Sequence, residues 1–361
     1  MFALACKLCY HNFMFLKIKS KIDSELQSYI ASTDKTYHLS SLSPLLFKSI
    51  KEFISRSGKR VRPILFCIGY LGFTKKPAPG LYRSAISLEL LHDFLLVHDD
   101  IIDKSETRRG LPSMHALLNN YLSKYKKIKF SGSDLTIVAG DVMYAMAFDA
   151  FLAIKENPER KESALKKLIS AALFTASGEF IELLLSIKPI EKISKDEIYK
   201  IYDYKTANYT FSSPLTMGAT LAGAGKNEIK KLFDYGIYLG RAFQIKDDII
   251  GIFCRESEIG KSNLTDIKEE KKTLLIWYAY NNACKKDKVI IKKILSGKSI
   301  KSKDLLEIRR IIKNSGALDY AKQEIKNLIK KAQRLIDNLP IASLYRKTLD
   351  EFCKKILVIN N

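Results

Sequence analysis

Glycine and proline are scarce in this sequence, with 17 and 9 occurrences among 361 residues. Runs of alternating β-branched residues bounded by turn signals are also missing, which argues against an all-β sandwich or barrel. Apolar residues instead recur with the helical period along most of the chain. We therefore expect an all-α protein. Its breaks, where the few glycines, prolines and polar clusters gather, leave long helical segments at 81–104, 135–154, 161–187, 196–222 and 228–253.

Several of these segments are apolar around most of their circumference, and 135–154 is the clearest example. Such helices belong to the centre of a large bundle rather than to its surface. No internal repeat, low-complexity tract or linker divides the chain. We expect one large helical domain over residues 21–361, with peripheral helices beyond residue 287. Residues 1–20 are an N-terminal extension of uncertain status.

Cysteines are few and scattered. Of the six, only Cys6 and Cys9 are close in sequence, and no second Cys-x-x-Cys or histidine cluster completes a zinc site. This usage fits a reduced, cytoplasmic protein. Long apolar runs are lacking too. The start of the chain is interrupted by Lys7, His11 and Asn12, which excludes a signal peptide or a spanning helix there, and no other segment is expected to cross a bilayer. Lysines without acids also fit a weak organelle-targeting segment, and initiation at Met14 is an equal alternative.

Acidic residues are outnumbered, 39 against 61 Lys and Arg, so the chain is strongly basic. This balance favours anionic partners such as phosphorylated metabolites, nucleic acid or acidic lipid headgroups, with peripheral rather than spanning membrane contact. Most of the excess is lysine scattered among isoleucine and asparagine, which is also what solvated helix faces look like. A nucleic-acid binder is disfavoured, because no recognition motif or aromatic-interleaved basic stripe is present.

Acids inside apolar segments are rare, which makes LLVHDDIIDKSETRRG at 95–110 stand out. It places Asp99, Asp100 and Asp103 in a run of leucine, valine and isoleucine, where an unpaired carboxylate is costly to desolvate. On a helix Asp99 and Asp103 share one face, roughly 6 Å apart at Cβ, whereas Asp100 points about 100° away. A hard divalent cation such as Mg²⁺ would stabilise the pair, and Mg²⁺ commonly shares its coordination with substrate phosphates.

Arginines follow these acids within one short loop. Arg108 and Arg109 carry guanidinium groups suited to phosphate oxygens, so the arrangement is typical of a site for a metal-chelated phosphate. For a lone motif, Asp–Arg ion pairs at a helix end would be the commoner arrangement. However, FQIKDDIIGIF at 243–253 repeats the scheme, with Asp247 and Asp248 inside an apolar helix and basic residues beyond. Two structural accidents of the same form in one chain are improbable.

Six motifs together resemble those of the trans-isoprenyl diphosphate synthases, the polyprenyl synthetase family. They occur in that family's order between about residues 45 and 280: GKRVRP (58–63), LLHDFLLVHDDIIDKSETRRG (90–110), GD (140–141), YKTANYTFSSP (204–214), FQIKDD (243–248) and GKSNLTDIKEEKKT (260–273). The resemblance implies a helical bundle of the isoprenoid synthase fold around a deep central cavity, usually as a homodimer. It also implies an enzyme that uses two or three Mg²⁺ ions to join isopentenyl diphosphate, head to tail, to an allylic diphosphate.

The resemblance also assigns roles, residue by residue. Mg²⁺ on the allylic diphosphate would be held by Asp99, Asp103 and Asp247, and the same diphosphate would be gripped by Arg108 and Lys205 and covered by Lys261 and Lys271. Isopentenyl diphosphate would be bound by Lys59, Arg62, His92 and Arg109. Thr206 and Gln244 would face the developing allylic cation. These roles agree with the chemistry, because ionising a carbon–oxygen bond requires fixed positive charge around the leaving diphosphate in a dry site.

Product length can be read from the residues before Asp99, because the growing chain would run down the cavity beside that helix. Phe94 and Leu95 lie about one turn or slightly more below Asp99, and no run of small residues opens a tunnel past the Phe94 ring. We expect a short all-trans product, geranylgeranyl diphosphate first and farnesyl diphosphate second. In the family that this sequence resembles, an aromatic residue at this position is typical of short-chain members.

Two departures from the family pattern leave alternatives open. Gly251 stands where the second motif would end in aspartate, which excludes a ligand for a third ion there, and no glycine precedes Lys271 in EEKKT. A non-catalytic subunit of a heteromeric synthase would explain Gly251, but it would not need Arg108 and Arg109 together. A terpene cyclase would not need GKRVRP and His92 for a second diphosphate.

Overall fold

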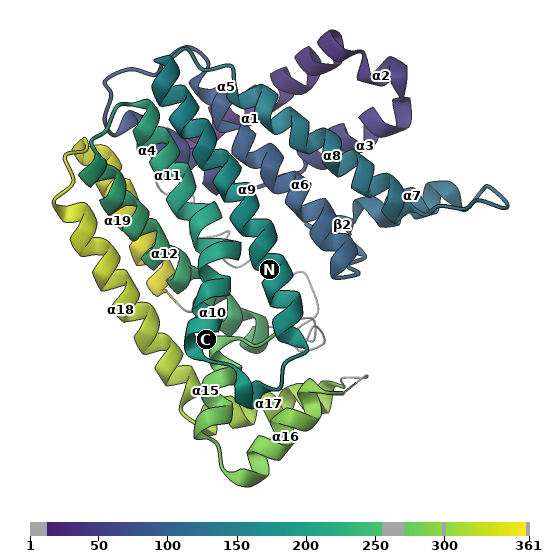
Figure 1. The fold of residues 1–361 in the computed structure, drawn as a ribbon, viewed down its shortest axis with the longest axis vertical. Coiled ribbons are helices and arrows are strands. Elements are labelled where there is room, and N and C mark those ends of the chain that lie inside the picture. Colours follow the sequence, from purple (N-terminus) through teal and green to yellow (C-terminus); the bar gives the residue numbers. More distant parts are fainter. Residues whose placement is uncertain (1–12, 255–270, 298–300, 359–361) are drawn as a thin grey trace.

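The computed structural model describes residues 13–254, 271–297 and 301–358, and this part of the chain is almost entirely helical, which confirms the expected all-α class (Figure 1). The elements in chain order are α1 (Phe13–Tyr37), α2 (Leu39–Leu42), α3 (Pro44–Ser55), α4 (Val61–Leu71), α5 (Leu81–Ala85), α6 (Ser87–Ile102), β1 (Thr107–Arg108), β2 (Leu111–Pro112), α7 (Met114–Leu122), α8 (Gly132–Phe151), α9 (Pro158–Ser186), η2 (Ile190–Lys192), α10 (Lys195–Ile201), η3 (Tyr202–Ser212), α11 (Ser213–Leu221), α12 (Lys226–Phe253), α15 (Leu274–Asn282), α16 (Lys285–Leu295), α17 (Ser302–Asn314), α18 (Ala317–Asp337) and α19 (Ser343–Leu357). The two short strands pair antiparallel.

Long helices pack side by side in the bundle (Figure 1). Helix α12 packs against α18 on one side and against η3 on another, and η3 in turn contacts α9. Helix α11 packs against α4 and α9, while α6 pairs with α8. The apolar interiors of these elements merge into one continuous core. The site therefore rests on helices that are packed from several sides.

Backbones approach closely at two of these crossings because glycine leaves room. A Cβ on Gly218 of α11 would lie 2.1 Å from the Phe66 carbonyl oxygen of α4. A Cβ on Gly240 of α12 would lie 2.3 Å from Cα of Ala207 in η3. Real Cβ atoms do not approach other atoms so closely, so each glycine fixes the distance between its two elements. The Gly240 contact sets how near α12 comes to η3, one turn before Gln244.

Two predicted segments are divided in the structure. Segment 81–104 is α5 followed by α6, with the break at Ile86. Segment 196–222 was expected as one helix, but it consists of α10, the eleven-residue π-helix η3 and α11. Helical periodicity marks where apolar faces recur and does not distinguish π turns from α turns, which explains why the sequence did not indicate this change.

We expected that no segment beyond the N-terminus would be long and apolar enough to span a bilayer. This expectation is wrong for helix α9. By length and composition it could cross a membrane, and only a third of its most apolar window is buried. In the bundle it nevertheless packs against η3 and α11. Its carboxylates Glu179 and Glu182 form ion pairs with Lys205, so α9 serves as a bundle helix with one apolar face exposed.

The substitution Gly240→Ala tests the close contact between α12 and η3. We expect the free energy of unfolding to fall by about 1–3 kcal/mol, the usual cost of overpacking, even though alanine favours the helix by roughly 1 kcal/mol. Urea unfolding followed by circular dichroism measures the change. Gly297→Ala is the matched control, because its added Cβ would meet nothing closer than 3.3 Å. Equal stability of both variants would contradict the proposed role of Gly240.

Candidate functional site

The first aspartate motif occupies the carboxyl end of α6. Asp99 and Asp100 lie in its last turn, and Asp103 is the C-cap. Asp100 is completely buried, and its carboxylate accepts a hydrogen bond of 2.7 Å from Nε of Arg108. Burial raises the pKa of Asp100 although Arg108 opposes the change. Arg108 therefore neutralises the buried member of the triplet, and it also lies 3.5 Å from the half-buried Asp99.

A third carboxylate, which the sequence reasoning missed, converges with Asp99 and Asp103. Ligand oxygens of Asp99, Asp103 and Glu179 lie within 4.8 Å of one another, and all three residues are half-buried. Glu179 comes from α9, whose stretch GEFIELLL holds two acids in an apolar run. Like the aspartates, these glutamates are acids inside an apolar segment, where an unpaired carboxylate is costly to desolvate. Burial, opposed by Lys205 and reinforced by Asp99, raises the pKa of Glu179.

Lys205 connects α9 to η3. Its Nζ lies 2.5 Å from Glu179 and is also paired with Glu182. Burial opposes the charged form, but Glu182 and Asp99 outweigh it and raise the pKa of Lys205, so the side chain is a fixed cation. Lys271 is close enough to counteract this shift. The structure thus brings Lys205 and Lys271 to the acidic group, as the sequence motifs suggested.

A chain of hydrogen bonds fixes Gln244 on α12. The Thr206 hydroxyl donates to Oε1 of Gln244 over 2.7 Å, and Nε2 of Gln244 donates to Asp248 over 2.9 Å. Asp248 is buried and also accepts a hydrogen bond from the Tyr202 hydroxyl. Asp248, the second aspartate of FQIKDD, therefore holds the Gln244 amide in place. This role was not predicted from the sequence.

A second group of cations lies where α4, α6, η3 and the short hairpin meet. Arg62 stacks over the Tyr209 ring at 4.3 Å and donates to the Thr210 hydroxyl over 2.8 Å. His92 lies beside the same ring, and its pKa is well below the usual value because of burial and the neighbouring Arg62 and Arg109. Histidine in this position is neutral, so its ring can donate one hydrogen bond and accept another.

Unsatisfied polar atoms make this second group a candidate binding site. Among the described residues, Nε of Arg62, one terminal nitrogen of Arg109 and the Tyr209 hydroxyl are buried without a hydrogen-bond partner. Buried donors are rarely left unpaired in folded proteins. Unpaired guanidinium donors of this kind would be satisfied by an anion with several oxygens, such as a diphosphate. Lys59, two residues before Val61 begins α4, is half-buried.

Arg60 supports this group from behind and was passed over in the sequence. It caps α4 in the left-handed conformation, with φ of 52°. Its buried guanidinium pairs with Glu89 at 2.6 Å and with Asp23 at 2.9 Å. Although burial opposes ionisation, Arg60 and Arg109 lower the pKa of Glu89, which keeps this carboxylate charged. The GKRVRP motif thus holds one structural arginine between residues that face the site.

Phe94 belongs to an aromatic stack between α6 and α8. Its ring centroid lies 4.7 Å from that of His98 and 4.9 Å from that of Tyr144, and Tyr144 continues to Phe148 at 4.8 Å. His98 donates from Nδ1 to the Phe94 carbonyl over 3.0 Å, which fits a structural histidine. Phe94 and Leu95 are half-buried. The sequence identified Phe94 but gave no sign that Tyr144 supports it.

Two expected site residues, Lys261 and Asp247, are not placed in either group by the described structure. Lys261 lies outside the described residues. Asp247 is half-buried on α12, but the carboxylate group found within the described residues does not include it. Its role as a metal ligand stays a prediction. Gly251 is buried on the same helix.

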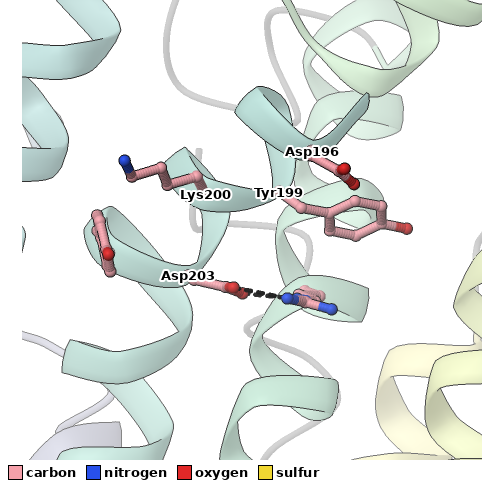
Figure 2. Close-up of a pocket in the computed structure, with 6 residues that line it drawn as sticks. Asp196, Tyr199, Lys200 and Asp203 are labelled. Carbon is pink, nitrogen blue, oxygen red and sulfur yellow. Dashed lines mark hydrogen bonds and ion pairs between the residues drawn. The ribbon is translucent and has the colours of Figure 1, made fainter. Parts of the chain in front are cut away.

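A separate recess of about 250 Å³ lies between α10, η3 and α12, lined by Asp196, Tyr199, Lys200, Asp203, Tyr204 and Arg241 (Figure 2). Arg241 and Asp203 satisfy each other there through two hydrogen bonds of 2.6 Å. Lys200 lies over the Tyr204 ring at 5.8 Å. The Arg241 guanidinium of this recess is thus already paired, in contrast to the unpaired guanidinium nitrogens of the second group.

Comparison with known proteins agrees with this geometry. The family model for polyprenyl synthetase matches residues 43–312. A geranylgeranyl diphosphate synthase of Sulfolobus acidocaldarius is 32% identical over 352 residues, which cover 96% of this chain and 98% of that protein. A geranylfarnesyl diphosphate synthase of Aeropyrum pernix is 31% identical, covering 82% and 88%. In fold, the crystal structure of a geranylgeranyl pyrophosphate synthase of Corynebacterium glutamicum, complexed with isoprenyl diphosphate and magnesium, has a TM-score of 0.86 at 24% identity, covering 95% and 99%.

The substitution Arg60→Gln tests whether this residue is the structural support of the second group. It would leave Glu89 buried without its main cation, so we expect a loss of about 3–5 kcal/mol in the free energy of unfolding. Lys230→Gln is the control, because Lys230 forms an exposed pair with Asp234 and its loss should leave the stability nearly unchanged. Denaturant unfolding at pH 7 measures both variants. Similar losses in the two would contradict the structural role of Arg60.

Proposed function

The chain belongs to the polyprenyl synthetase family, and from this premise we propose how its two groups of side chains divide the work of a prenyltransferase. The enzyme condenses isopentenyl diphosphate with an allylic diphosphate to give a short-chain all-trans prenyl diphosphate. The observation that carries this proposal is the pairing of a convergent carboxylate group with a separate set of unsatisfied buried cations. One can hold a metal-chelated diphosphate and the other a second diphosphate.

The carboxylate group fits a hard divalent cation. Asp99, Asp103 and Glu179 offer three oxygens within 4.8 Å, and like charges at such distances repel unless a cation lies between them. Mg²⁺ is the ion that we propose, two or three per site, with Asp247 as a further ligand. When bound, Mg²⁺ would neutralise charge that develops on the leaving diphosphate.

Lys205 and Arg108 are the cations placed beside this group. Lys205 is paired with Glu179 and Glu182, and Arg108 with Asp100 and Asp99. We propose that both also contact the allylic diphosphate, together with Lys271 and Lys261. Because their partners are anchored on α6 and α9, the cations are already in position before the carbon–oxygen bond breaks. Such preorganised charge stabilises the transition state without reorganisation.

Arg62, Arg109, His92 and Lys59 bind the isopentenyl diphosphate in this proposal. The unpaired nitrogens of Arg62 and Arg109 supply donors, and neutral His92 adds a hydrogen bond without further charge. The π-helix η3 contributes Tyr209 and Thr210 on this side and Lys205 and Thr206 on the other. A single element therefore sets the separation of the two substrates.

Bond making follows from this arrangement. The allylic carbon–oxygen bond breaks and its electron pair leaves with the diphosphate. The π electrons of isopentenyl diphosphate then form the new carbon–carbon bond, and the released diphosphate can accept the proton that is lost. Gln244 and Thr206 present oriented dipoles toward the cationic intermediate, because the Thr206 hydrogen is donated to Gln244 and its oxygen lone pairs are left to face the cation. A neutral amide and a neutral hydroxyl are both weak nucleophiles. The apolar side chains of α6 and α12 keep water away.

Geranylgeranyl diphosphate is the product that we propose, with farnesyl diphosphate as second choice. Phe94 and Leu95 lie below Asp99 on α6, and Tyr144 backs the Phe94 ring from α8. These two layers of side chains support the proposal that the cavity is closed below Asp99. The name of the Sulfolobus relative agrees with it, whereas the Aeropyrum relative is named for a product one isoprene unit longer.

A homodimer is proposed on the exposed apolar face of α8 and α9. The large apolar side chains exposed there are Ile137, Val138, Leu152, Ile169, Leu173, Phe174, Phe180, Leu183, Leu184 and Ile187. Exposed large apolar side chains in such number are typical of a protein interface. Burying it against a second copy would cover α9, whose carboxylates on the opposite side contact Lys205.

The decisive assay incubates the purified protein with Mg²⁺, labelled isopentenyl diphosphate and dimethylallyl, geranyl or farnesyl diphosphate. We expect all-trans products and a loss of about a hundred- to a thousand-fold in turnover for Asp103→Ala, because a charge-stabilising group at the transition state is removed. Asp319→Ala, on the exposed surface of α18, is the control. No turnover by the wild-type protein would favour the non-catalytic subunit. Normal turnover by Asp103→Ala would contradict the metal assignment.

The substitution Phe94→Ala tests the floor. Removing the ring should lengthen the products, with Tyr144 limiting how far, and chromatography of the dephosphorylated products measures their distribution. Phe233→Ala, on an exposed part of α12, is the control. If Phe94→Ala keeps the wild-type distribution, Phe94 does not determine product length.

A further inference from the structure

Asp93 is a charged residue that the proposed reaction does not use. Its side chain on α6 is completely buried beside the cations assigned to isopentenyl diphosphate. One oxygen lies 3.3 Å from a terminal nitrogen of Arg109. The other, Oδ2, is buried without a hydrogen-bond partner among the described residues. A buried carboxylate that is only half satisfied is costly, which suggests that it has a function.

The neighbouring charged groups are engaged with other partners, so Asp93 is the main partner of Arg109. Glu89, one turn earlier on α6, is engaged by Arg60 at 2.6 Å and lies 3.8 Å from Arg109. Arg62 is directed to Tyr209 and Thr210. Asp93 is therefore the nearest anion of Arg109 and engages one terminal nitrogen of its guanidinium, while the other terminal nitrogen is left for the proposed substrate.

A diphosphate bound to Arg109 would compete with Asp93 and add negative charge next to it. Two anions held close together in a buried site repel each other, which favours protonation of one of them. Here the Asp93 carboxylate can take up that proton. We propose that Asp93 is a positioning residue for the homoallylic substrate: it holds Arg109 in the free enzyme and takes up a proton from solvent when isopentenyl diphosphate binds to that arginine. This inference rests on the proposed assignment of Arg109 to isopentenyl diphosphate.

Charged and titratable groups face Asp93 from every side of the pocket: Glu89 and His92 of α6, Arg60 and Arg62 at the start of α4, Arg109 of the hairpin and Tyr209 of η3. Burial raises the pKa of Asp93 to about 7, with Arg109 opposing and Glu89 reinforcing the rise. The pKa of Glu89 and of His92 is lowered, and that of Tyr209 is raised by burial. Asp93 is thus the group in this set that changes charge near neutral pH.

The direction of the pH effect follows. Below pH 7 Asp93 is already protonated and Arg109 is available. Above pH 7 the substrate must share Arg109 with a charged carboxylate, so its binding weakens as pH rises. Because binding of isopentenyl diphosphate is coupled to one proton on Asp93, its affinity falls by up to about tenfold for each pH unit above the pKa of Asp93.

The test measures the KM for isopentenyl diphosphate from pH 6.5 to 8.5 at saturating allylic substrate and Mg²⁺. Asp93→Asn keeps the shape but cannot ionise. We expect the wild-type KM to rise about tenfold more between pH 7 and 8.5 than that of Asp93→Asn, with no such difference in the KM of the allylic substrate. The comparison cancels ionisation of the substrate itself. Asp196→Asn, on the exposed start of α10, should follow the wild type. Equal slopes for wild type and Asp93→Asn would overturn the inference.

Calorimetry of the unmodified protein provides a second measurement that does not depend on the variant folding. Isopentenyl diphosphate alone is titrated at pH 7.5 in two buffers with different ionisation enthalpies. Net proton uptake supports the inference, and its absence overturns it. Arg109→Gln separates the two levels of the argument. If it leaves the KM for isopentenyl diphosphate unchanged, the proposed site assignment fails. If it raises that KM while Asp93→Asn behaves as wild type, only the role of Asp93 fails.

Discussion

Carboxylates buried in an apolar bundle are the constraint on which the rest of the site depends. Asp93, Asp100 and Asp248 are each nine-tenths or more buried, and burying a charge without a partner costs several kcal/mol. Asp93 is paired with Arg109 and Asp100 with Arg108, and Asp248 accepts hydrogen bonds from Tyr202 and Gln244. These partners are held in place because the buried acids require them. The same pairs place positive charge and polarised groups around the space where we propose that the diphosphates bind. In this proposal, fold stability and substrate binding share one set of ion pairs.

The backbone converts these pairs into a geometry. The π-helix η3 lies between α9 and α12 and carries Lys205 and Thr206 toward one group and Tyr209 and Thr210 toward the other. Gly240 lets α12 approach η3 closely enough for Thr206 to reach Gln244. Wider turns within helices are frequent at functional sites, and here the π-helix spans both proposed diphosphate positions.

Much of this arrangement could be predicted from the sequence, because acids that recur at helical spacing in two apolar runs, with basic residues close behind, indicate a charged binding site. Long helices such as α9 and α12 were placed within a few residues, since periodicity reports burial directly. Glu179, Tyr144 and Arg60 were missed for a different reason. Each acquires its role through a neighbour distant in sequence: Asp99, Phe94 and Glu89. The anchoring role of Asp248 likewise depends on Tyr202, forty-six residues earlier.

The central claim is that two separate groups of cations bind two different diphosphates. It is tested most directly by steady-state kinetics of Lys59→Gln and Lys205→Gln with both substrates varied. We expect Lys59→Gln to raise the KM for isopentenyl diphosphate by about ten- to a hundred-fold, the worth of one charged hydrogen bond, with the allylic KM nearly unchanged. Lys205→Gln should show the opposite pattern. If both substitutions raise the same Michaelis constant, the division into two sites is wrong.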